Sequence, residues 1–292
     1  MSKALVTGAS YGIGADIARA LAARGHDLVL AARSGEALDR LAAGIGAEHG
    51  ITARALHADL TVEADLERVA EAACDVDILV NNAGAGLGIS FERTAWAEER
   101  RMLQLNVVAP ARLLHAVLPP MLERGSGRIL NISSVAATAP VWQGTTYGAS
   151  KAFGLALTES LAYSHRLRAS PVAMTALVLG HTASRFHELA GIAPSPPLLT
   201  LPSPYVAERA VRAIHRRRPP VVCVPSVRYK LLTGLLQHLP RRLVTLPGLA
   251  DDFTTIASHA PGTAARPPES GGADGEHGVL AAEAGGHRER QL

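Results

Sequence analysis

The fold is decided by the stretch Lys3-Ala4-Leu5-Val6-Thr7-Gly8-Ala9-Ser10-Tyr11-Gly12-Ile13-Gly14 and the segment 15–24 that follows it. Residues 3–7 form a short, mostly apolar run, and after three glycines the apolar residues recur with helical spacing until Gly25. A strand, a glycine loop and a helix in this order open a βαβ unit. Glycines at this turn let backbone amides approach a bound pyrophosphate at the positive end of the helix. The stretch predicts a dinucleotide site, although a purely structural glycine turn would show the same pattern.

Further apolar runs alternate with segments of helical periodicity along the rest of the chain. Strands are predicted at 27–32, 52–57, 77–80, 128–133, 172–179 and 221–224, and helices at 35–47, 62–73, 96–118, 147–166, 203–217 and 229–239. Strands that are apolar over their whole length are typical of a buried parallel sheet with helices on both faces. We therefore expect an α/β fold built on a doubly wound parallel sheet of about seven strands.

One domain is expected to cover residues 1–250. The region 185–204 contains five prolines and no clear period, which favours a loop or a small lid. From about Asp251 the composition changes to Gly, Pro, Ala and charged residues with almost no large apolar side chains. Residues 251–292 are therefore predicted to form a disordered acidic tail.

Composition narrows the functional classes. The chain has 292 residues and a net charge of +3, which is too small to indicate a nucleic-acid partner. Cys74 and Cys223 belong to no CxxC pair, so we expect free thiols in a reducing compartment, with neither a disulfide framework nor a metal site. The amino terminus does not resemble a signal peptide, and no run of about 18 apolar residues predicts a transmembrane segment. These features favour a cytoplasmic protein.

Charge is unevenly distributed in the carboxyl-terminal part. Residues 205–242 contain nine Lys and Arg and one acid, Glu208, whereas residues 251–292 contain seven acids and three arginines. A basic segment of this kind is usually a solvated helix face. An anionic ligand, a peripheral contact with a membrane surface, or the acidic tail itself are the alternatives.

Tyr147 and Lys151 lie four positions apart in the stretch Tyr147-Gly148-Ala149-Ser150-Lys151, so a helix would place them on one face. A phenol has a pKa of about 10, which is too high for easy proton transfer near neutrality. A nearby ammonium group would lower that pKa. A solvent-facing pair on an ordinary helix has the same spacing, so the rest of the chain has to decide between the two interpretations.

Several motifs occur together and in a fixed order: TGASYGIG at 7–14, Asp59, NNAG at 81–84, Asn106, Ser134 and YGASK at 147–151. In this combination the chain resembles the short-chain dehydrogenase/reductase family over about residues 3–186. The resemblance implies a Rossmann-like fold. It also implies an oxidoreductase, such as a carbonyl reductase, that moves a hydride between a nicotinamide cofactor and a small carbonyl or alcohol substrate. It further implies a homodimer or homotetramer built through the helices that contain Asn106 and Tyr147.

The resemblance also implies roles for individual residues. Tyr147 would be the general acid or base, and Lys151 would lower its pKa and bind the nicotinamide ribose. Asn106 would hold a water molecule in a proton relay, unless its side chain makes only a local helix bond. The family places its carbonyl-orienting serine thirteen residues before the tyrosine, which favours Ser134 over its neighbour Ser133.

The implied cofactor site gathers loops at the carboxyl ends of the strands. Its residues are Gly8, Ser10, Tyr11, Gly12, Ile13, Gly14, Arg33, Ser34, Asp59, Leu60, Asn82, Ala83, Gly84, Tyr147, Lys151, Gly180, Thr182 and Ser184. Asp59 would contact the adenine, or would only cap a turn. Asn81 would brace the central strands and approach the adenosine ribose.

The end of the second predicted strand indicates the cofactor. Enzymes that use NAD carry a carboxylate there for the ribose hydroxyls, whereas this chain has Ala32 followed by Arg33 and Ser34. A guanidinium suits a phosphate, so NADP(H) is the preferred cofactor and NAD(H) the alternative. Tyr11 departs from the basic residue that many NADP-preferring relatives carry in the glycine loop.

The loop after the sixth predicted strand departs from the family pattern, because Leu179 replaces a proline and Ser184 replaces a threonine. His181 in this loop is either a substrate contact or a surface residue. Apolar side chains of the lid favour a hydrophobic ketone. The alternative function is a non-catalytic NADP(H)-binding regulatory module, which a Tyr147→Phe comparison would distinguish from an enzyme.

Overall fold

Seven parallel strands form the central sheet of the computed structural model, which describes residues 2–88, 90–138, 145–183 and 199–244. Their order is β3-β2-β1-β4-β5-β6-β9. The strands are β1 Lys3–Thr7, β2 Asp27–Ala32, β3 Ala53–His57, β4 Ile78–Asn81, β5 Arg128–Ser134, β6 Ala173–Leu179 and β9 Val222–Cys223. The order reverses between β1 and β4, as in a doubly wound sheet, which confirms the predicted fold class.

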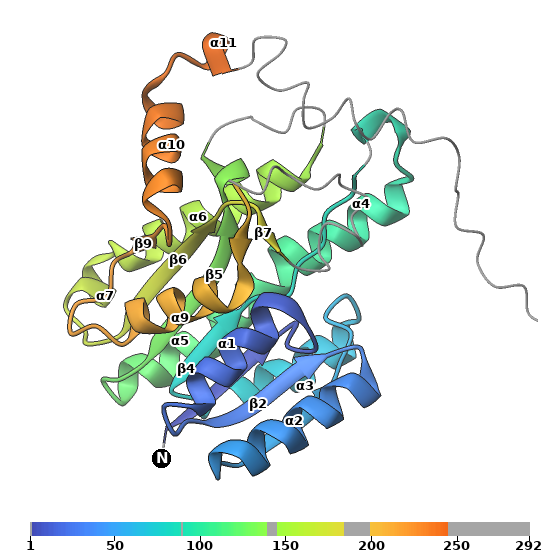
Figure 1. The fold of residues 1–292 in the computed structure, drawn as a ribbon, viewed down its shortest axis with the longest axis vertical. Helices are drawn as coiled ribbons and strands as arrows, with labels where there is room; N and C mark the ends of the chain where they lie inside the picture. The colour runs from blue at the N-terminus through green and yellow to red at the C-terminus, as the bar shows by residue number, and fades with distance from the viewer. Residues whose placement is uncertain (1, 89, 139–144, 184–198, 245–292) are drawn as a thin grey trace, which may run out of the picture. The chain divides into compact units, whose positions relative to one another are not determined.

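Helices cover both faces of this sheet (Figure 1). The α-helices are α1 Gly12–Ala22, α2 Gly35–His49, α3 Glu63–Ala73, α4 Trp96–Leu103, α5 Ala109–Glu123, α6 Tyr147–Ala162, α7 His165–Arg168, α9 Ser203–Ile214, α10 Val227–His238 and α11 Arg241–Val244. Single 3-10 turns occupy Phe91–Arg93 and Val135–Ala137.

Alternation along β1 illustrates how the two cores form. Ala4 and Val6 are fully buried on the face covered by α1, α2 and α9, while Leu5 is fully buried on the face covered by α3 and α5. Successive side chains of a strand point to opposite faces, so a strand buried on both sides is apolar at every position.

The predicted helix 203–217 ends early, at Ile214, and two other predicted helices differ from the structure in their course. The predicted helix 96–118 continues through Pro119 and Pro120 to Glu123, and it widens to a π turn over Gln104–Val108. Pro110 has no amide hydrogen to donate to the carbonyl of Asn106 four residues earlier, and the π turn lies just before this missing bond, with the amide of Ala109 donating to the carbonyl of Gln104. The predicted helix 147–166 was wrong at its end, because it stops at Ala162 and a short helix, α7, follows.

The second break has a local cause at Ser164. Its hydroxyl accepts a hydrogen bond of 3.4 Å from the amide of Leu167, which caps a new helix start and so favours a separate α7.

The continuous helix 96–123 is also relevant to the expectation that no segment could span a membrane. An 18-residue window of this helix has a mean hydropathy of 1.3, so by length and composition alone it could cross a bilayer. Leu113, Val117 and Met121 of this helix pack into the core against the sheet. A core helix passes the same test, so the composition of this helix is weak evidence for a membrane span.

A parallel pair of two-residue strands, β7 Thr182–Ala183 and β8 Leu201–Pro202, lies within and beside the predicted lid. Residues 185–198 of that lid, and Ser184 just before it, lie outside the described residues. The predicted domain boundary near residue 250 and the tail 251–292 also lie outside them.

Candidate active site

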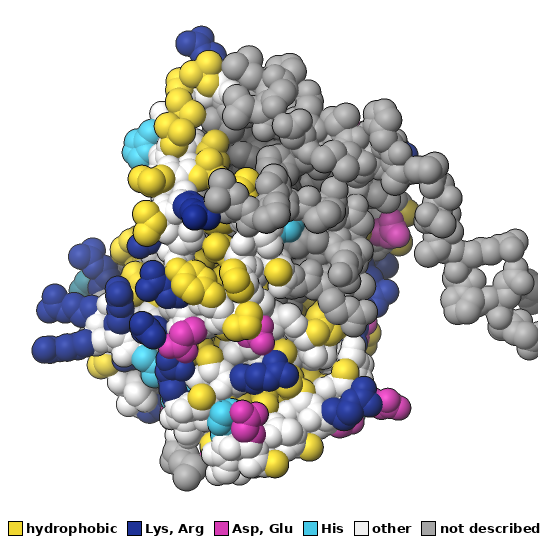
Figure 2. Space-filling view, viewed as in Figure 1, with side chains coloured by type: hydrophobic (Ala, Val, Ile, Leu, Met, Phe, Trp, Pro, Cys, Tyr) yellow, Lys and Arg dark blue, Asp and Glu magenta, His cyan; other side chains and the backbone are white. Residues whose placement is uncertain are grey.

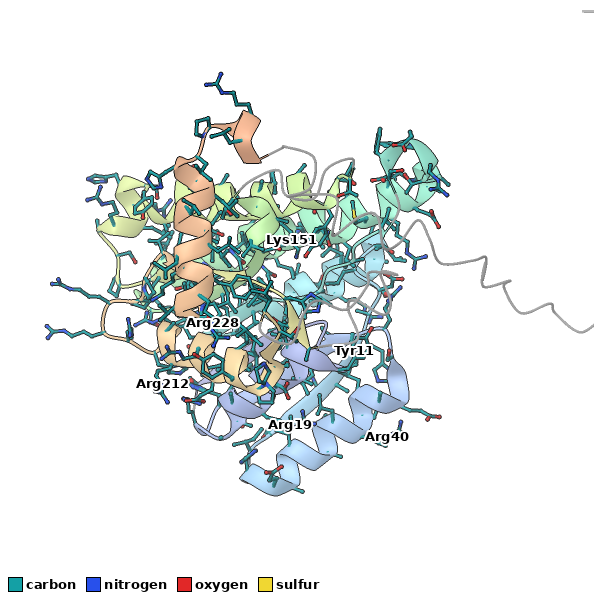
Figure 3. All side chains as sticks on the ribbon, turned by 45° about the horizontal axis from the view of Figure 1, so that its top comes forward. Tyr11, Arg19, Arg40, Lys151, Arg212 and Arg228 are labelled. Atoms are coloured by element: carbon teal, nitrogen blue, oxygen red, sulfur yellow. The ribbon has the colours of Figure 1, made fainter. Side chains whose placement is uncertain are left out.

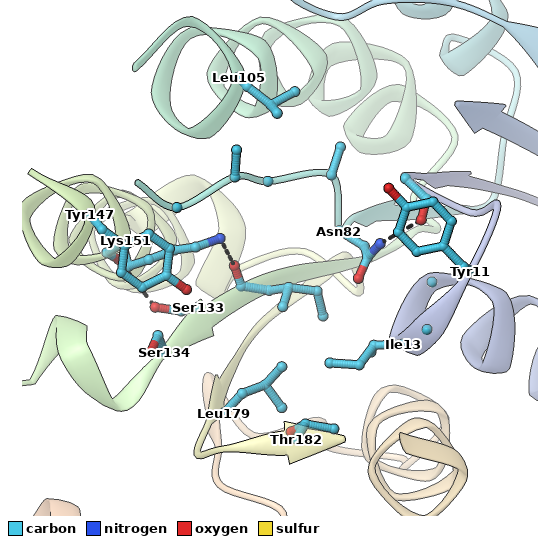
Figure 4. Close-up of a pocket in the computed structure, with 18 of the residues that line it drawn as sticks. Tyr11, Ile13, Asn82, Leu105, Ser133, Ser134, Tyr147, Lys151, Leu179 and Thr182 are labelled. Carbon is cyan, nitrogen blue, oxygen red and sulfur yellow. Dashed lines mark hydrogen bonds between the residues drawn. The ribbon is translucent and has the colours of Figure 1, made fainter. Parts of the chain in front are cut away.

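A cavity of about 730 Å³ runs along the carboxyl ends of the strands, from the glycine loop to Tyr147 (Figure 4). Open parallel sheets bind ligands at this edge, next to the point where the strand order reverses. All the predicted cofactor-binding residues that the structure describes line this cavity, which leaves out only Ser184. Ser134 lines it as well, whereas Asn106 lies behind it.

The glycine loop is shaped by its own packing. Gly8 and Gly12 have φ angles of 64° and 60°, in the left-handed region that favours glycine. A Cβ atom on Gly14 would lie 2.4 Å from the carbonyl oxygen of Gly8. The glycines are therefore needed by the fold itself, as the structural alternative predicted. The N-cap residue Tyr11 makes no side-chain capping bond, however, and the start of α1 faces the cavity, so its amides fit an anionic group.

Thr7 and Asn82 join the ends of β1 and β4 under this loop. The Thr7 hydroxyl accepts hydrogen bonds of 3.0 Å from the amides of Asn82 and Ala83. In return, the Asn82 side chain donates to the carbonyls of Thr7 at 2.9 Å and Gly8 at 3.1 Å. These bonds hold the loops after β1 and β4 in one arrangement.

Asn81 is placed differently from Asn82. Its Nδ2 donates to the Oδ1 of Asn131 at 2.9 Å, so it braces β4 against β5 inside the sheet. Asn81 does not line the large cavity, and its Oδ1 is a buried atom without a hydrogen-bond partner among the described residues. This position agrees with the expectation that Asn81 braces the central strands. It does not agree with the expectation that Asn81 approaches the adenosine ribose.

The two adjacent serines have separate partners. Ser133 donates from its hydroxyl to the backbone carbonyl of Lys151 at 3.1 Å, which ties β5 to α6. Ser134 accepts from the amide of Ala136 at 3.2 Å, and its side chain also hydrogen-bonds the hydroxyl of Tyr147. Of the two, Ser134 is therefore the serine beside the phenol, and Ser133 has a bracing contact.

Tyr147 and Lys151 are both buried on one face of α6 (Figure 4). Burial raises the pKa of Tyr147 to about 12, although the hydrogen bond with Ser134 opposes that shift, and burial lowers the pKa of Lys151 to about 8. The Lys151 ammonium donates to the carbonyl of Ile132 at 3.2 Å and lies 5.8 Å from the centre of the Tyr147 ring. In the chain alone the net pKa shift of Tyr147 is therefore upward, opposite to the lowering expected from Lys151, because desolvation of the phenol dominates.

Asn106 bonds across elements and not along its own helix. Its Oδ1 accepts from the amide of Ala85 at 2.9 Å, and its Nδ2 donates to the carbonyl of Ala85 at 2.8 Å and to the hydroxyl of Ser150 at 3.0 Å. A Cβ atom on Gly84 would lie 3.1 Å from the Lys151 ammonium and 3.2 Å from the Asn106 Oδ1. Asn106 thus holds the loop after β4 against α6, close to Lys151.

A carboxylate and two guanidinium groups meet at the far end of the cavity. Asp59 accepts from Arg101 at 2.9 Å, and its carboxylate lies 3.9 Å from Arg33. Burial alone would raise the pKa of Asp59, but hydrogen bonds from Thr61 and the charges of both arginines outweigh it, so the net pKa is lowered. The Thr61 bonds form the turn cap that was one alternative for Asp59. Arg101 was missed, because it lies 42 residues away on α4.

Helix α10 supplies a wall of the cavity that sequence reasoning also missed. Tyr229 is buried, and its hydroxyl donates to the carbonyl of Leu199 at 2.7 Å and accepts from the amide of His181 at 2.9 Å. Its ring covers Gly180, where a Cβ atom would lie 1.9 Å from the ring. Leu232 and Leu236 line the cavity from the same helix. A glycine at position 180, directly after β6, could have indicated that another group packs closely there. It could not have identified that group as Tyr229.

Comparisons with known proteins agree with this geometry. The family model for short chain dehydrogenases matches residues 2–190. The ketoacyl reductase HetN of a Nostoc species is 31% identical over 237 residues, which are 80% of this chain and 82% of HetN. The NADP-dependent 3-hydroxy acid dehydrogenase YdfG of Escherichia coli is 37% identical over 150 residues, which are 51% of this chain and 60% of YdfG.

A solved structure has the same fold. The short-chain dehydrogenase from Sphingobium yanoikuyae in complex with NADPH is 34% identical and superposes with a TM-score of 0.72, covering 82% of this chain and 97% of that one. The family match, the parallel sheet and the cavity together lead to one conclusion: the chain belongs to the short-chain dehydrogenase/reductase family of NAD(P)-dependent oxidoreductases.

Proposed function

We propose that this protein is an NADP(H)-dependent enzyme that reduces a hydrophobic ketone or aldehyde to an alcohol, or catalyses the reverse reaction, with Tyr147 as the general acid or base. The observation that carries the proposal is the hydrogen bond between Tyr147 and Ser134 in the wall of the cavity, whose other end is the glycine loop. A carbonyl oxygen between the two hydroxyls would meet both a proton donor and a second hydrogen-bond donor.

The protonation state of Tyr147 supports the direction of reduction. With a pKa of about 12, the phenol keeps its proton throughout the neutral range. Reduction requires that form, because the carbonyl oxygen takes a proton while the carbonyl carbon gains a hydride. Oxidation of an alcohol requires the phenolate, which burial makes scarce.

Lys151 and Asn106 would support this step. The pKa of Lys151, lowered to about 8, brings its proton within exchange range of neutral pH. The bonds from Asn106 to Ala85 and Ser150 hold the loop after β4 beside the Lys151 ammonium, which makes Asn106 a positioning residue.

The cavity fits a phosphorylated dinucleotide, which when bound would supply the hydride. The uncapped start of α1 would hold its pyrophosphate, and Arg33 with Ser34 would hold a 2′-phosphate. Arg33 is 60% exposed at the cavity rim, so its guanidinium can turn toward a ligand. The NADPH complex of the Sphingobium enzyme and the NADP dependence of YdfG support this preference, with NAD(H) as the alternative.

The oligomer is part of the proposal as well. Large apolar side chains are exposed on the helices around Asn106 and Tyr147: Trp96 at 66%, Val108 at 43% and Phe153 at 42%. Contact between two copies through these helices would cover them.

The test is oxidation of NADPH, followed spectrophotometrically across a panel of ketones, for the wild-type chain and Tyr147→Phe. We expect the variant to bind NADPH as the wild type does and to lose at least about a hundredfold in kcat. Tight NADPH binding with no Tyr147-dependent turnover on any carbonyl would contradict the proposal and favour a regulatory binding module.

A further inference from the structure

The outer face of α10 is an exposed apolar ridge. Val227, Leu231 and Leu235 follow one another at four-residue intervals, which places them on one face of the helix. Their exposed fractions are 66%, 71% and 58%. Figure 2 shows the hydrophobic side chains along α10, with Lys and Arg side chains gathered beside its base. Contiguous exposed apolar side chains mark an interaction site more often than isolated ones do.

The opposite face of α10 belongs to the cavity. Tyr229, Leu232 and Leu236 line the cavity, and Leu232 remains 37% exposed between the two faces. The helix is therefore apolar both toward the cavity and toward its surroundings, and the exposed Arg228 and His238 lie on the same side as the ridge. A helix that only covered the cavity would need no second apolar face.

Positively charged side chains lie beside the base of this helix. Burial raises the pKa of Cys223, and the charges of Lys230, Arg216 and Arg209 oppose that shift, which places all three cations within electrostatic reach of β9. Helix α10 begins four residues after β9, with Arg228 in its first turn (Figure 3). The whole stretch 205–242 carries nine Lys and Arg and one acid.

We propose that α10 docks on the surface of an anionic lipid bilayer, with Val227, Leu231 and Leu235 at the boundary of the acyl chains and the surrounding cations among the headgroups. Helices that lie in a membrane interface combine an apolar face with Lys and Arg in this way.

Two other occupants fit the ridge less well. A second copy docked about a two-fold axis would bring two identical basic segments together, and their charges would repel. The acidic tail 251–292 has complementary charge, but its large apolar side chains are few: Phe253, Ile256, Val279, Leu280 and Leu292. An anionic bilayer offers acyl chains to the apolar ridge and negatively charged headgroups to the cations.

Docking would also set the route of a substrate. Because one helix carries both the ridge and a wall of the cavity, a hydrophobic ketone dissolved in the bilayer would enter beside Leu232. This consequence rests on the proposed function, whereas the docking itself does not.

The test is flotation of the full chain with vesicles of phosphatidylcholine, with and without about 30 mol % phosphatidylglycerol. We expect binding to the anionic vesicles that weakens at about 0.5 M NaCl. The double variant Leu231→Gln/Leu235→Gln should bind at least about tenfold more weakly. The matched control Val62→Gln/Tyr163→Gln removes two exposed apolar side chains far along the chain from α10 and should bind as the wild type does.

Two results would overturn the proposal: no binding of the full chain to anionic vesicles, or equal binding of the Leu231/Leu235 variant and the wild type. NADPH oxidation with a water-soluble ketone should be the same in both proteins, which also shows that the variant is folded. Vesicle binding is measured without turnover, so a failure here is distinct from a failure of the proposed reductase.

Discussion

The contact between Gly180 and Tyr229 allows a sharp test of how α10 is attached. In the change Gly180→Ala, the new Cβ atom would lie 1.9 Å from Cζ of the Tyr229 ring and 2.1 and 2.2 Å from its two Cε atoms. Gly180 does not have a positive φ, so the backbone accepts alanine and the cost is steric. Because the clashing atoms belong to the outer part of a side chain, Tyr229 has to leave its position.

The magnitude follows from what Tyr229 would lose. Its hydroxyl makes hydrogen bonds of 2.7 Å to Leu199 and 2.9 Å to His181, each contributing about 0.5–1.5 kcal/mol. Its ring is only 5% exposed, and partial exposure of the ring adds a loss of about 1 kcal/mol. We therefore expect Gly180→Ala to lower the free energy of unfolding by about 2–4 kcal/mol.

The assay is a double-mutant cycle by urea unfolding. In a Tyr229→Ala background the clash is gone, so Gly180→Ala should cost less than about 0.5 kcal/mol or stabilise slightly. Gly154→Ala is the matched control, because a Cβ atom there meets open space, and it should stabilise α6 by about 0.5–1 kcal/mol. The same cost for Gly180→Ala in both backgrounds would refute the reasoning.

Three other predictions concern the cofactor and pH. Arg33→Asp should lower kcat/KM for NADPH relative to NADH at least about tenfold, while Arg40→Asp, whose ion pair is with Glu36 on the exposed side of α2, should not; equal ratios would contradict the NADP assignment. Because the pKa of Tyr147 is about 12, alcohol oxidation should accelerate from pH 7 to pH 10 while ketone reduction does not, and parallel profiles would argue against Tyr147 as the acid or base. Burial, followed by the charge of His215, lowers the pKa of His26 below 6.5 in the folded protein. The imidazole of His26 therefore binds a proton more readily in the unfolded chain than in the folded protein. The free energy of unfolding should therefore fall as pH drops below about 6.5, and less so in His26→Gln; identical pH profiles would exclude His26 as the cause.

The local sequence pattern predicted those parts of the fold that depend on interactions between residues close together in the chain. The strand and glycine loop around Gly8, Gly12 and Gly14 could be placed from sequence, because their spacing and φ requirements are properties of adjacent residues. The break of the predicted helix 147–166 was missed, since a capping serine is a weak signal inside an apolar periodic segment.

Some residues of the candidate active site could likewise be predicted from the sequence, and others could not. Tyr147, Lys151 and Ser134 could be chosen because their motifs resemble those of the family, and the structure brings them together at one cavity. Tyr229 and Arg101 could not, because their partners are supplied by folding over long sequence separations. The pKa of Tyr147 also depends on burial, which is a property of the whole packed domain and not of the four-residue interval to Lys151.

The close packing of Gly14 on Gly8 limits what mutagenesis of the glycine loop can reveal. A side chain at Gly14 would collide with the Gly8 carbonyl and, at 2.5 Å, with the Asn82 amide, whether or not a dinucleotide is present. If a glycine-loop variant loses activity, the loss therefore cannot be assigned to misfolding or to weak ligand affinity, because the substitution causes both. Equilibrium titrations intended to isolate affinity have to alter a solvent-facing side chain such as Arg33. A substitution there does not change the backbone conformation of the loop.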